Sequence, residues 1–203
     1  MKTNPVIGVL AIQGDVREHI SHLNQCDVTT VEVRTPAQLE GIDGLVIPGG
    51  ESTTMSILAQ RNGLLEPLRE LKSRIPMYGS CAGLIMLADR IENGRPDQET
   101  IGGINMTAAR NAFGRQVDSF EIDLSIPVLG SDTFHAVFIR APLVVEIGPN
   151  VTVLATLPAA VSNSGQDQIV AVQQGNLLAT SFHPEITSDL RFHQYFVEMV
   201  KNS

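Results

Sequence analysis

Residues 76–89 read PMYGSCAGLIMLAD, and this stretch decides the fold of the chain. An apolar run over Pro76–Gly79 predicts a short buried strand, and a helical pattern follows over Ala82–Asp89. Strands that are apolar on both faces and lead directly into helices are typical of parallel sheets covered by helices on both sides. The stretch therefore predicts an α/β fold.

The same alternation of short apolar runs and helical patterns fills the first half of the chain. Further strands are predicted at Val6–Ile12, Thr29–Val33 and Gly44–Ile47, and helices at Val16–Gln25, Thr53–Gln60 and Leu64–Lys72. Strands joined by helices require right-handed crossovers between parallel neighbours. The first half is therefore expected to form the parallel part of the sheet.

The second half is rich in strands and poor in helices. Strands are predicted at Ile104–Ala109, Ser119–Ile126, Ala136–Ile139, Val144–Ile147, Val151–Leu157, Ile169–Gln173 and Leu177–Phe182, and a final helix at Asp189–Lys201. Gln174-Gly175-Asn176 predicts a hairpin turn, and Ser162–Asp167 a hairpin loop. We predict one domain over residues 1–203, a three-layer, mostly parallel sheet flanked by helices, with an added antiparallel portion in the second half.

Composition and net charge exclude several classes of protein. The 203 residues are 43% hydrophobic and 18% charged, as in an ordinary globular chain. No apolar run approaches the ~20 residues that span a bilayer, and the N-terminus indicates a buried strand rather than a signal peptide. A net charge of −8 argues against a nucleic-acid partner. Because there are only two cysteines, Cys26 and Cys81, we expect free thiols and a cytoplasmic location.

The segment Gly79-Ser80-Cys81-Ala82-Gly83 places a cysteine on a tight turn between strand and helix. A nucleophile on such a turn takes a strained backbone conformation and needs small neighbours, which the two glycines provide. The following helix N-terminus favours the thiolate, and the N–H of Ala82 can stabilise an oxyanion. Cys81 is therefore the predicted nucleophile, whereas Cys26 is expected to be a small buried side chain.

A cysteine nucleophile needs a histidine partner, which in turn needs a group that orients it. Among five histidines, only His183 directly follows a predicted strand in a suggestive context, His183-Pro184-Glu185. The two-residue spacing across a rigid proline can direct both side chains to one side. Glu185 can then accept a hydrogen bond from one ring nitrogen while the other nitrogen faces the sulfur. His183 is therefore the predicted base, and Glu185 is the residue predicted to orient it.

The other four histidines have no such context. His19 and His22 lie three apart on a predicted helix, which is also a possible metal spacing. We favour a solvated helix face for both, and we interpret His135 and His193 in the same way. No metal ion and no cofactor are predicted.

A second glycine turn, Pro48-Gly49-Gly50-Glu51-Ser52-Thr53-Thr54, also joins a predicted strand to a helix. Glycines let the backbone approach a ligand and direct N–H groups toward it. The spacing matches neither a P-loop nor a dinucleotide fingerprint. Because open α/β sheets bind ligands at the carboxyl ends of their strands, Gly50, Cys81 and His183 are expected to share one cleft.

These motifs resemble the class I (triad) glutamine amidotransferases, which are flavodoxin-like. Within them, the chain resembles the glutaminase subunits of pyridoxal 5′-phosphate synthases over nearly its whole length. The cysteine and His-Pro-Glu motifs carry only the wider resemblance. The narrower one rests on Leu10–Gly14 with Arg17–His19, Pro48–Thr54, Arg110–Glu121 and Phe138–Pro142.

The resemblance implies that Cys81, His183 and Glu185 form a triad that hydrolyses L-glutamine to L-glutamate and ammonia through a γ-glutamyl thioester. It implies an oxyanion hole made by the N–H groups of Gly50 and Ala82. The implied glutamine pocket consists of Gly49, Gly50, Glu51, Ser52, Arg110, Ile139 and Arg140. Arginine suits the substrate α-carboxylate, and Glu51 or backbone carbonyls suit its α-ammonium.

The resemblance also implies a partner, a (β/α)₈-barrel pyridoxal 5′-phosphate synthase subunit that takes up the ammonia in vitamin B6 biosynthesis. The two proteins would form a large hetero-oligomer. Gln13 falls in the region implied to contact this partner. Arg17 and His19 are candidates for the same docking surface, an alternative to the solvated-face interpretation of His19.

Three other functions stay open at this point. A glutaminase subunit of another amidotransferase, such as imidazole glycerol phosphate synthase, would differ in the barrel protein that it binds. A cysteine peptidase or γ-glutamyl hydrolase on the same fold would accept peptides or polyglutamates rather than free glutamine. A non-enzymatic interaction subunit would carry these motifs without turnover.

Overall fold

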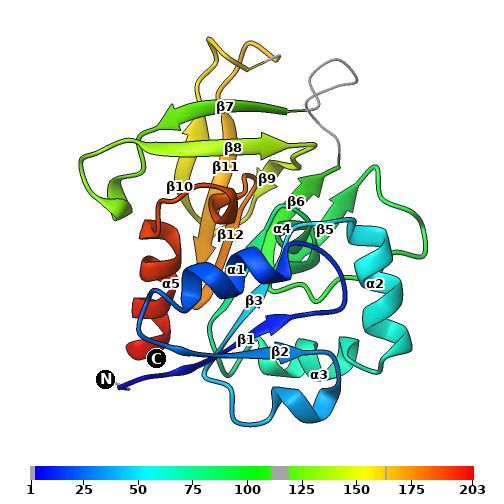
Figure 1. Cartoon of the computed structure of the whole chain (residues 1–203). Helices are drawn as coiled ribbons and strands as arrows, with labels where there is room; N and C mark the ends of the chain where they lie inside the picture. The colour runs from blue at the N-terminus through cyan, green and yellow to red at the C-terminus, as the bar shows by residue number, and fades with distance from the viewer. Residues whose placement is uncertain (1–2, 111–118, 163) are drawn as a thin grey trace.

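Five parallel strands form the centre of the computed structural model, which describes residues 3–110, 119–162 and 164–203 (Figure 1). In spatial order they are β2 (Thr29–Val33), β1 (Val6–Leu10), β3 (Gly44–Ile47), β4 (Met77–Ser80) and β12 (Leu177–Thr180). All neighbouring pairs are parallel. The carboxyl ends of these strands therefore meet at one edge of the sheet.

Beyond β12 the sheet continues as an extension in which most neighbours are antiparallel. It consists of β11 (Gln168–Gln174), β10 (Thr152–Leu157), β9 (Leu143–Ile147), β6 (Ile104–Ala109) and the edge strand β5 (Ala88–Glu92). The predicted turn between β11 and β12 is confirmed, because Gln174 pairs with Leu177 and Gly175 has a φ of +56°. A separate antiparallel pair, β7 (Ser119–Leu124) and β8 (Phe134–Ile139), lies at the top of Figure 1.

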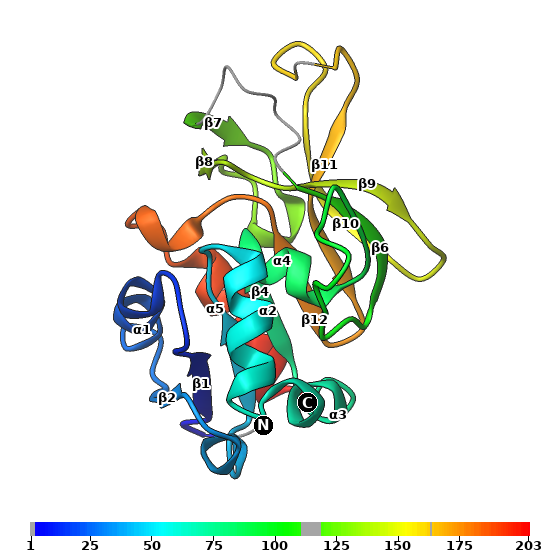
Figure 2. The same cartoon turned by 90° about the vertical axis from the view of Figure 1, so that its right-hand side faces the viewer.

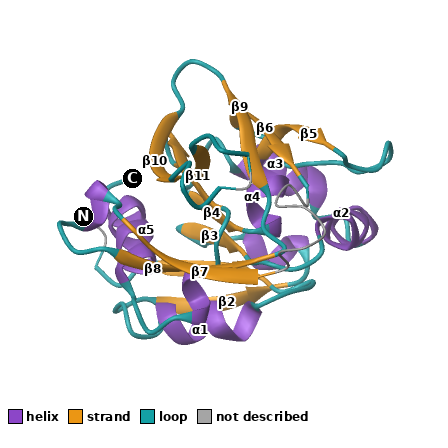
Figure 3. Ribbon diagram, turned by 90° about the horizontal axis from the view of Figure 1, so that it is seen from above, coloured by secondary structure: helices purple, strands orange, loops and turns teal. Residues whose placement is uncertain are grey.

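Helices cover both faces of the parallel strands (Figures 2 and 3). One face carries α1 (Val16–Leu23) and α5 (Arg191–Lys201), and the other carries α2 (Ser52–Arg61), α3 (Leu65–Leu71) and α4 (Ala82–Leu87). Three short 3₁₀ helices among the described residues are η1 (Pro36–Leu39), η2 (Pro127–Leu129) and η3 (Pro184–Ile186). The predicted three-layer α/β architecture with an antiparallel portion is confirmed.

Two hydrophobic cores fill the space between the sheet and its helices. Successive residues of one strand point to opposite faces, so they contribute to different cores. Val46 of β3 lies in the same core as Leu23 of α1 and Phe196 of α5, whereas Ile47 lies with Met55 of α2. All five side chains are buried, which explains why the parallel strands are apolar throughout.

One helix was predicted to extend too far, and its last residues belong to a strand that was not predicted. The helix after Cys81 was expected to reach Asp89, but α4 ends at Leu87 and Ala88–Glu92 forms β5 beside β6. Arg90 of β5 donates to Thr107 of β6 over 2.9 Å, a contact between neighbouring strands. An apolar run that precedes such a segment does not by itself distinguish a helix from a strand. Within the described ranges, no helix has the length and apolar character required to cross a membrane.

Replacing the buried ring of α5, Phe196→Ala, should lower the free energy of unfolding by about 3–5 kcal/mol, because it opens a cavity against the sheet. Urea unfolding measures the change. The control is Val145→Ala on β9, where the side chain is 49% exposed and the expected change is within about 0.5 kcal/mol. Equal losses in the two variants would contradict this assignment of the core.

Candidate active site

The tight turn Gly79–Gly83, which we call the cysteine elbow, joins β4 to α4 at the carboxyl edge of the sheet. Cys81 has φ 48° and ψ −102°, a left-handed conformation that side chains rarely adopt, and its N–H donates to the Thr180 carbonyl over 2.8 Å. A Cβ on Gly79 would lie 2.3 Å from the Gly83 carbonyl oxygen, and one on Gly83 would lie 2.1 Å from the Ile47 carbonyl oxygen. Both neighbours must therefore be glycine for this turn to form.

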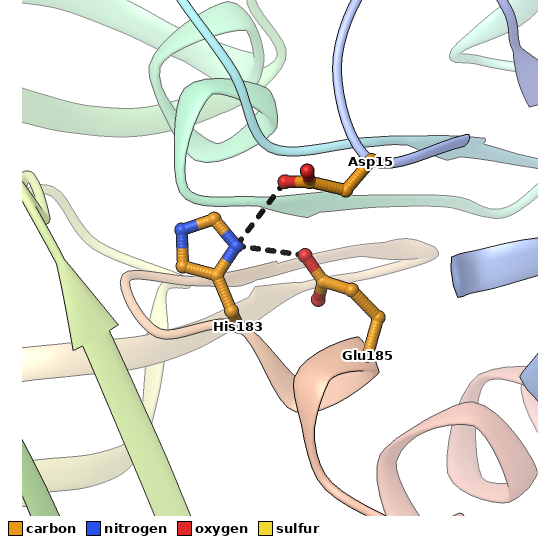
Figure 4. Close-up of side chains that lie close together, drawn as sticks. All are labelled: Asp15, His183 and Glu185. Carbon is orange, nitrogen blue, oxygen red and sulfur yellow. Dashed lines mark hydrogen bonds and ion pairs between the residues drawn. The ribbon is translucent and has the colours of Figure 1, made fainter. Parts of the chain in front are cut away.

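His183 follows β12 and brings its ring to the same edge. Its N–H donates to the Val137 carbonyl of β8 over 2.9 Å, which fixes the backbone beside the second, smaller sheet. The ring nitrogen Nδ1 lies 2.7 Å from Oε1 of Glu185 on η3, and both side chains are buried (Figure 4). The second ring nitrogen points away from both carboxylates (Figure 4), and the Cys81 side chain is among the groups that raise the pKa of this ring.

A second carboxylate faces the same nitrogen of His183, and the sequence analysis missed it. Oδ2 of Asp15 lies 3.5 Å from Nδ1, farther than Glu185, and the Asp15 side chain is 40% exposed (Figure 4). Asp15 follows β1 and directly precedes α1, so its position at a strand carboxyl end was a signal that could have identified it. One ring N–H therefore has two candidate acceptors, of which Glu185 is the closer.

These partners keep the His183 ring protonated. Burial lowers its pKa, but the hydrogen bonds to Asp15, Cys81 and Glu185, together with the charge of Cys81, outweigh burial and raise the pKa to about 12. Asp15, His183 and Glu185 offer three ligand atoms within 4.8 Å of one another, a grouping that could hold a metal ion. A protonated Nδ1 has no lone pair for a metal, so the cluster is better suited to holding a proton.

A pocket of about 340 Å³ opens in front of the cysteine. The predicted site residues that line it are Gly50, Glu51, Ser52, Cys81, Ala82, Arg110 and Arg140. Arg110 donates to Oε1 of Glu51 over 2.7 Å, so the two charged groups expected to bind a zwitterionic substrate pair with each other. Thr53 and Gln98, which sequence reasoning did not single out, hold the other arm of the Arg110 guanidinium.

Glu51 also caps helix α2. Its carboxylate accepts from the N–H groups of Thr53 over 3.1 Å and Thr54 over 2.6 Å. Although burial raises its pKa, the hydrogen bonds from Thr54 and Thr53 lower the pKa of Glu51 below its ordinary value. The carboxylate is therefore charged at neutral pH and fixed at the rim of the pocket.

Two predicted pocket residues lie beside the pocket instead of lining it. A Cβ on Gly49 would lie 2.5 Å from Cε1 of His183, so Gly49 makes room for the base. Ile139 places its carbonyl oxygen 3.9 Å from Sγ of Cys81. Of the residues that carried the family resemblance, 111–118 lie outside the described residues.

Three of the four histidines predicted to be solvated are buried, so that prediction was wrong. His19 and His193 are fully buried and His22 nearly so, between α1, α5 and β4. The solvated interpretation holds for His135, which lies exposed between Asp123 and Glu121 on β7. The predicted burial of Cys26 as a small free thiol is confirmed.

The fold and the elbow define the architecture of the class I glutamine amidotransferases. The model of the SNO glutamine amidotransferase family matches residues 9–202, and the chain belongs to this family.

Curated relatives are similar over the full length. A protein named "Pyridoxal 5'-phosphate synthase subunit PdxT" from Rhodococcus opacus (strain B4) is 54% identical over 200 residues, 98% of each chain. One of the same name from Kineococcus radiotolerans is 55% identical, covering 97% of this chain and 95% of the other. A solved glutamine amidotransferase aligns with a TM-score of 0.86 at 45% identity, covering 96% of this chain and 98% of the other. PurLQS from Thermotoga maritima, at 14% identity and a TM-score of 0.71, shares the fold alone, over 99% of both chains.

Asp15→Asn should lower the pKa of His183, because it removes a charged acceptor from Nδ1. NMR of the ring nitrogens as a function of pH measures the change. Glu18→Gln, which neutralises an exposed carboxylate at the start of α1, is the matched control and should leave the pKa in place. An unchanged pKa in Asp15→Asn would show that Glu185 and Cys81 alone hold the proton.

The burial of His193 should make the fold labile to acid. Burial and the charge of His22 lower the pKa of His193 to about 3. Between about pH 6.5 and 3, the unfolded chain therefore binds a proton at this histidine and the folded chain does not. Going from about pH 7 to about pH 5 should therefore cost about 2 kcal/mol for His193 alone. Urea unfolding at both pH values should show that loss, and His193→Gln should remove it; an equal pH dependence in the variant would contradict this origin.

Proposed function

We propose that this chain is the glutaminase subunit of a pyridoxal 5′-phosphate synthase, hydrolysing L-glutamine to L-glutamate and ammonia. The observation that carries the proposal is the buried Cys81 on its strained elbow, beside a His183 ring that Glu185 orients. Relatives that are 54–55% identical over nearly the whole chain and are named as subunits of that synthase support the choice of pathway.

In the proposed mechanism, the Cys81 thiolate attacks the side-chain carbonyl carbon of glutamine. The resulting oxyanion is stabilised by the N–H groups of Gly50 and Ala82, both of which border the pocket. The C–N bond then breaks, and His183 gives its proton to the departing nitrogen, which leaves as ammonia. The neutral ring next takes a proton from water, the hydroxide attacks the γ-glutamyl thioester, and the C–S bond breaks to release glutamate and the thiolate.

The electrostatics of the site favour this reaction. A His183 ring that stays protonated at neutral pH already carries the proton that the departing nitrogen needs. After the ring gives up its proton, Glu185 at 2.7 Å keeps Nδ1 protonated and leaves the other nitrogen free to act as base. The same histidine can therefore serve both halves of the cycle.

Glutamine recognition is assigned to the charged rim of the pocket. Arg110 and Arg140 are candidates for the α-carboxylate, and Glu51 for the α-ammonium. Arg110 and Glu51 already form an ion pair with each other. A bound zwitterion would therefore add one charge of each sign to this pair and leave the group of charges neutral. This arrangement disfavours substrates that lack either charge.

The proposed partner is a (β/α)₈-barrel synthase subunit that takes up the ammonia in a hetero-oligomer. Gln13 links the implied docking region to the site, because its Oε1 accepts from the N–H of Glu51 over 3.0 Å. A Cβ on Gly50 would lie 2.5 Å from the Gln13 side chain, so docking at Gln13 bears directly on the proposed oxyanion hole. The two free thiols support the expectation of a reducing, cytoplasmic setting.

Cys81→Ala should lower glutamate release from free glutamine by several orders of magnitude, on the order of 10⁵ or more, because no other nucleophile replaces the thiolate. The assay is run on the chain alone and with a pyridoxal phosphate synthase barrel. Cys26→Ala, the other thiol, is the control and should retain activity.

The outcomes separate the competing functions. Activity that rises with this barrel and disappears in Cys81→Ala supports the full proposal. Activity that ignores this barrel points to another synthase, and hydrolysis of peptides or polyglutamates in place of glutamine points to a peptidase or γ-glutamyl hydrolase. Undiminished activity in Cys81→Ala would show that Cys81 is not the nucleophile.

A further inference from the structure

The carboxylate of Glu185 has a second oxygen that the mechanism leaves unused. Oε1 bonds to His183, whereas Oε2 is buried and, within the described part of the chain, has no hydrogen-bond partner at normal distance. Nε2 of His19, on α1, approaches Oε2 to 3.5 Å, and both side chains are fully buried. A buried carboxylate oxygen without a donor is costly, so this approach needs an explanation.

His19 also reaches the residue that precedes the nucleophile. Its Nε2 lies 2.9 Å from Oγ of Ser80, the last residue of β4, and Cys81 follows immediately. Its other nitrogen, Nδ1, lies 2.9 Å from Nε2 of His193 on α5. One imidazole therefore joins the cysteine elbow, the carboxylate behind the base and the two helices of one face.

The contacts determine which nitrogens carry protons. With the hydrogen on Nε2, His19 donates toward Ser80 and Glu185, and its Nδ1 accepts from Nε2–H of His193. His193 is then left with a bare Nδ1, which agrees with the finding that this buried atom has no partner among the described residues. The opposite tautomers would direct a lone pair at the carboxylate and bury an unpartnered N–H, and both are unfavourable.

We propose that His19, as the neutral Nε2–H tautomer, is a positioning residue that holds Oε2 of Glu185 and thereby keeps Oε1 directed at His183. The proposal rests on the proposed glutaminase function, since it assigns His19 to the orientation of that enzyme's base. His19 contacts neither substrate nor sulfur in this role. It acts through Glu185 and through Ser80.

The surroundings keep His19 neutral, as the role requires. Burial, followed by the neighbouring rings of His193, His183 and His22, lowers its pKa well below the ordinary value. The titratable groups that face it are Glu185, His183, His193, His22 and Tyr78. A charged His19 would compete with the His183 imidazolium for the same carboxylate, whereas a neutral N–H orients the carboxylate without neutralising it.

The first test needs no substitution. NMR of the histidine ring nitrogens in the intact chain should show His19 as the neutral Nε2–H tautomer between about pH 5 and 8, below and above the ordinary histidine value. An Nδ1–H tautomer or a protonated ring in that range would overturn the proposal.

The second test compares three variants on α1. His19→Leu removes the donor, His19→Gln retains an N–H at a similar reach, and His22→Leu is the matched control. His22 is also buried on α1, but among the described residues its ring bonds to the backbone carbonyls of Glu18 over 3.1 Å and Thr187 over 2.7 Å and not to Glu185 or Ser80. In His19→Leu, kcat should fall by roughly 10- to 100-fold with KM unchanged, because the base is misplaced. His19→Gln should recover most of the loss, and His22→Leu should retain the kcat of the original chain.

A readout independent of turnover separates this proposal from the proposed function. Loosening Glu185 in His19→Leu should lower the pKa of His183, measured by NMR, whereas His22→Leu should not. If the original chain hydrolyses no glutamine, the proposed function fails while the pKa comparison still decides the role of His19. A folded His19→Leu with unchanged kcat and unchanged His183 pKa, or equal changes in His22→Leu, would overturn the proposal.

Discussion

The left-handed backbone of Cys81 is the constraint on which the rest of the structure depends. A φ of 48° is unfavourable for a cysteine, and it persists because the flanking segments hold it from both sides. The Thr180 carbonyl of β12 accepts the Cys81 N–H, and the Ile47 carbonyl of β3 lies where any side chain at Gly83 would have to go. Three adjacent parallel strands therefore meet at the nucleophile, and the elbow is only as rigid as their pairing.

The parallel sheet also explains how distant segments supply one site. The carboxyl ends of β1, β3, β4 and β12 lead into Asp15, Gly49, Cys81 and His183, respectively. Two carboxylates and a thiol around one imidazole stabilise its proton, and the charge pair of Arg110 and Glu51 marks the other side of the pocket. The topology of the sheet therefore determines where the groups of the site lie, because each of these four strands ends next to one of them.

A layer of buried polar side chains lies beneath the site, and the stability of the fold depends on how these side chains are hydrogen-bonded. Glu185, His19 and His193 are buried between the sheet and the two helices α1 and α5, where each must find a partner or lose stability. Their contacts satisfy most but not all of these atoms, because Oε2 of Glu185 and Nδ1 of His193 lack close partners among the described residues. An apolar layer would pack more stably, but it could not hold the carboxylate that orients the base.

Sequence alone determined the parts of this protein that depend on neighbours in the chain. Apolar runs and helical patterns located nearly all strands and helices, the Gly-x-Cys-x-Gly turn identified Cys81, and the two-residue spacing paired His183 with Glu185. Only the tertiary structure decided that His19 and His193 are buried, where α1, α5 and β4 meet, and that Asp15 approaches His183. The physical reason is that turn geometry and periodicity are local, whereas burial and partner choice depend on which distant segments pack together.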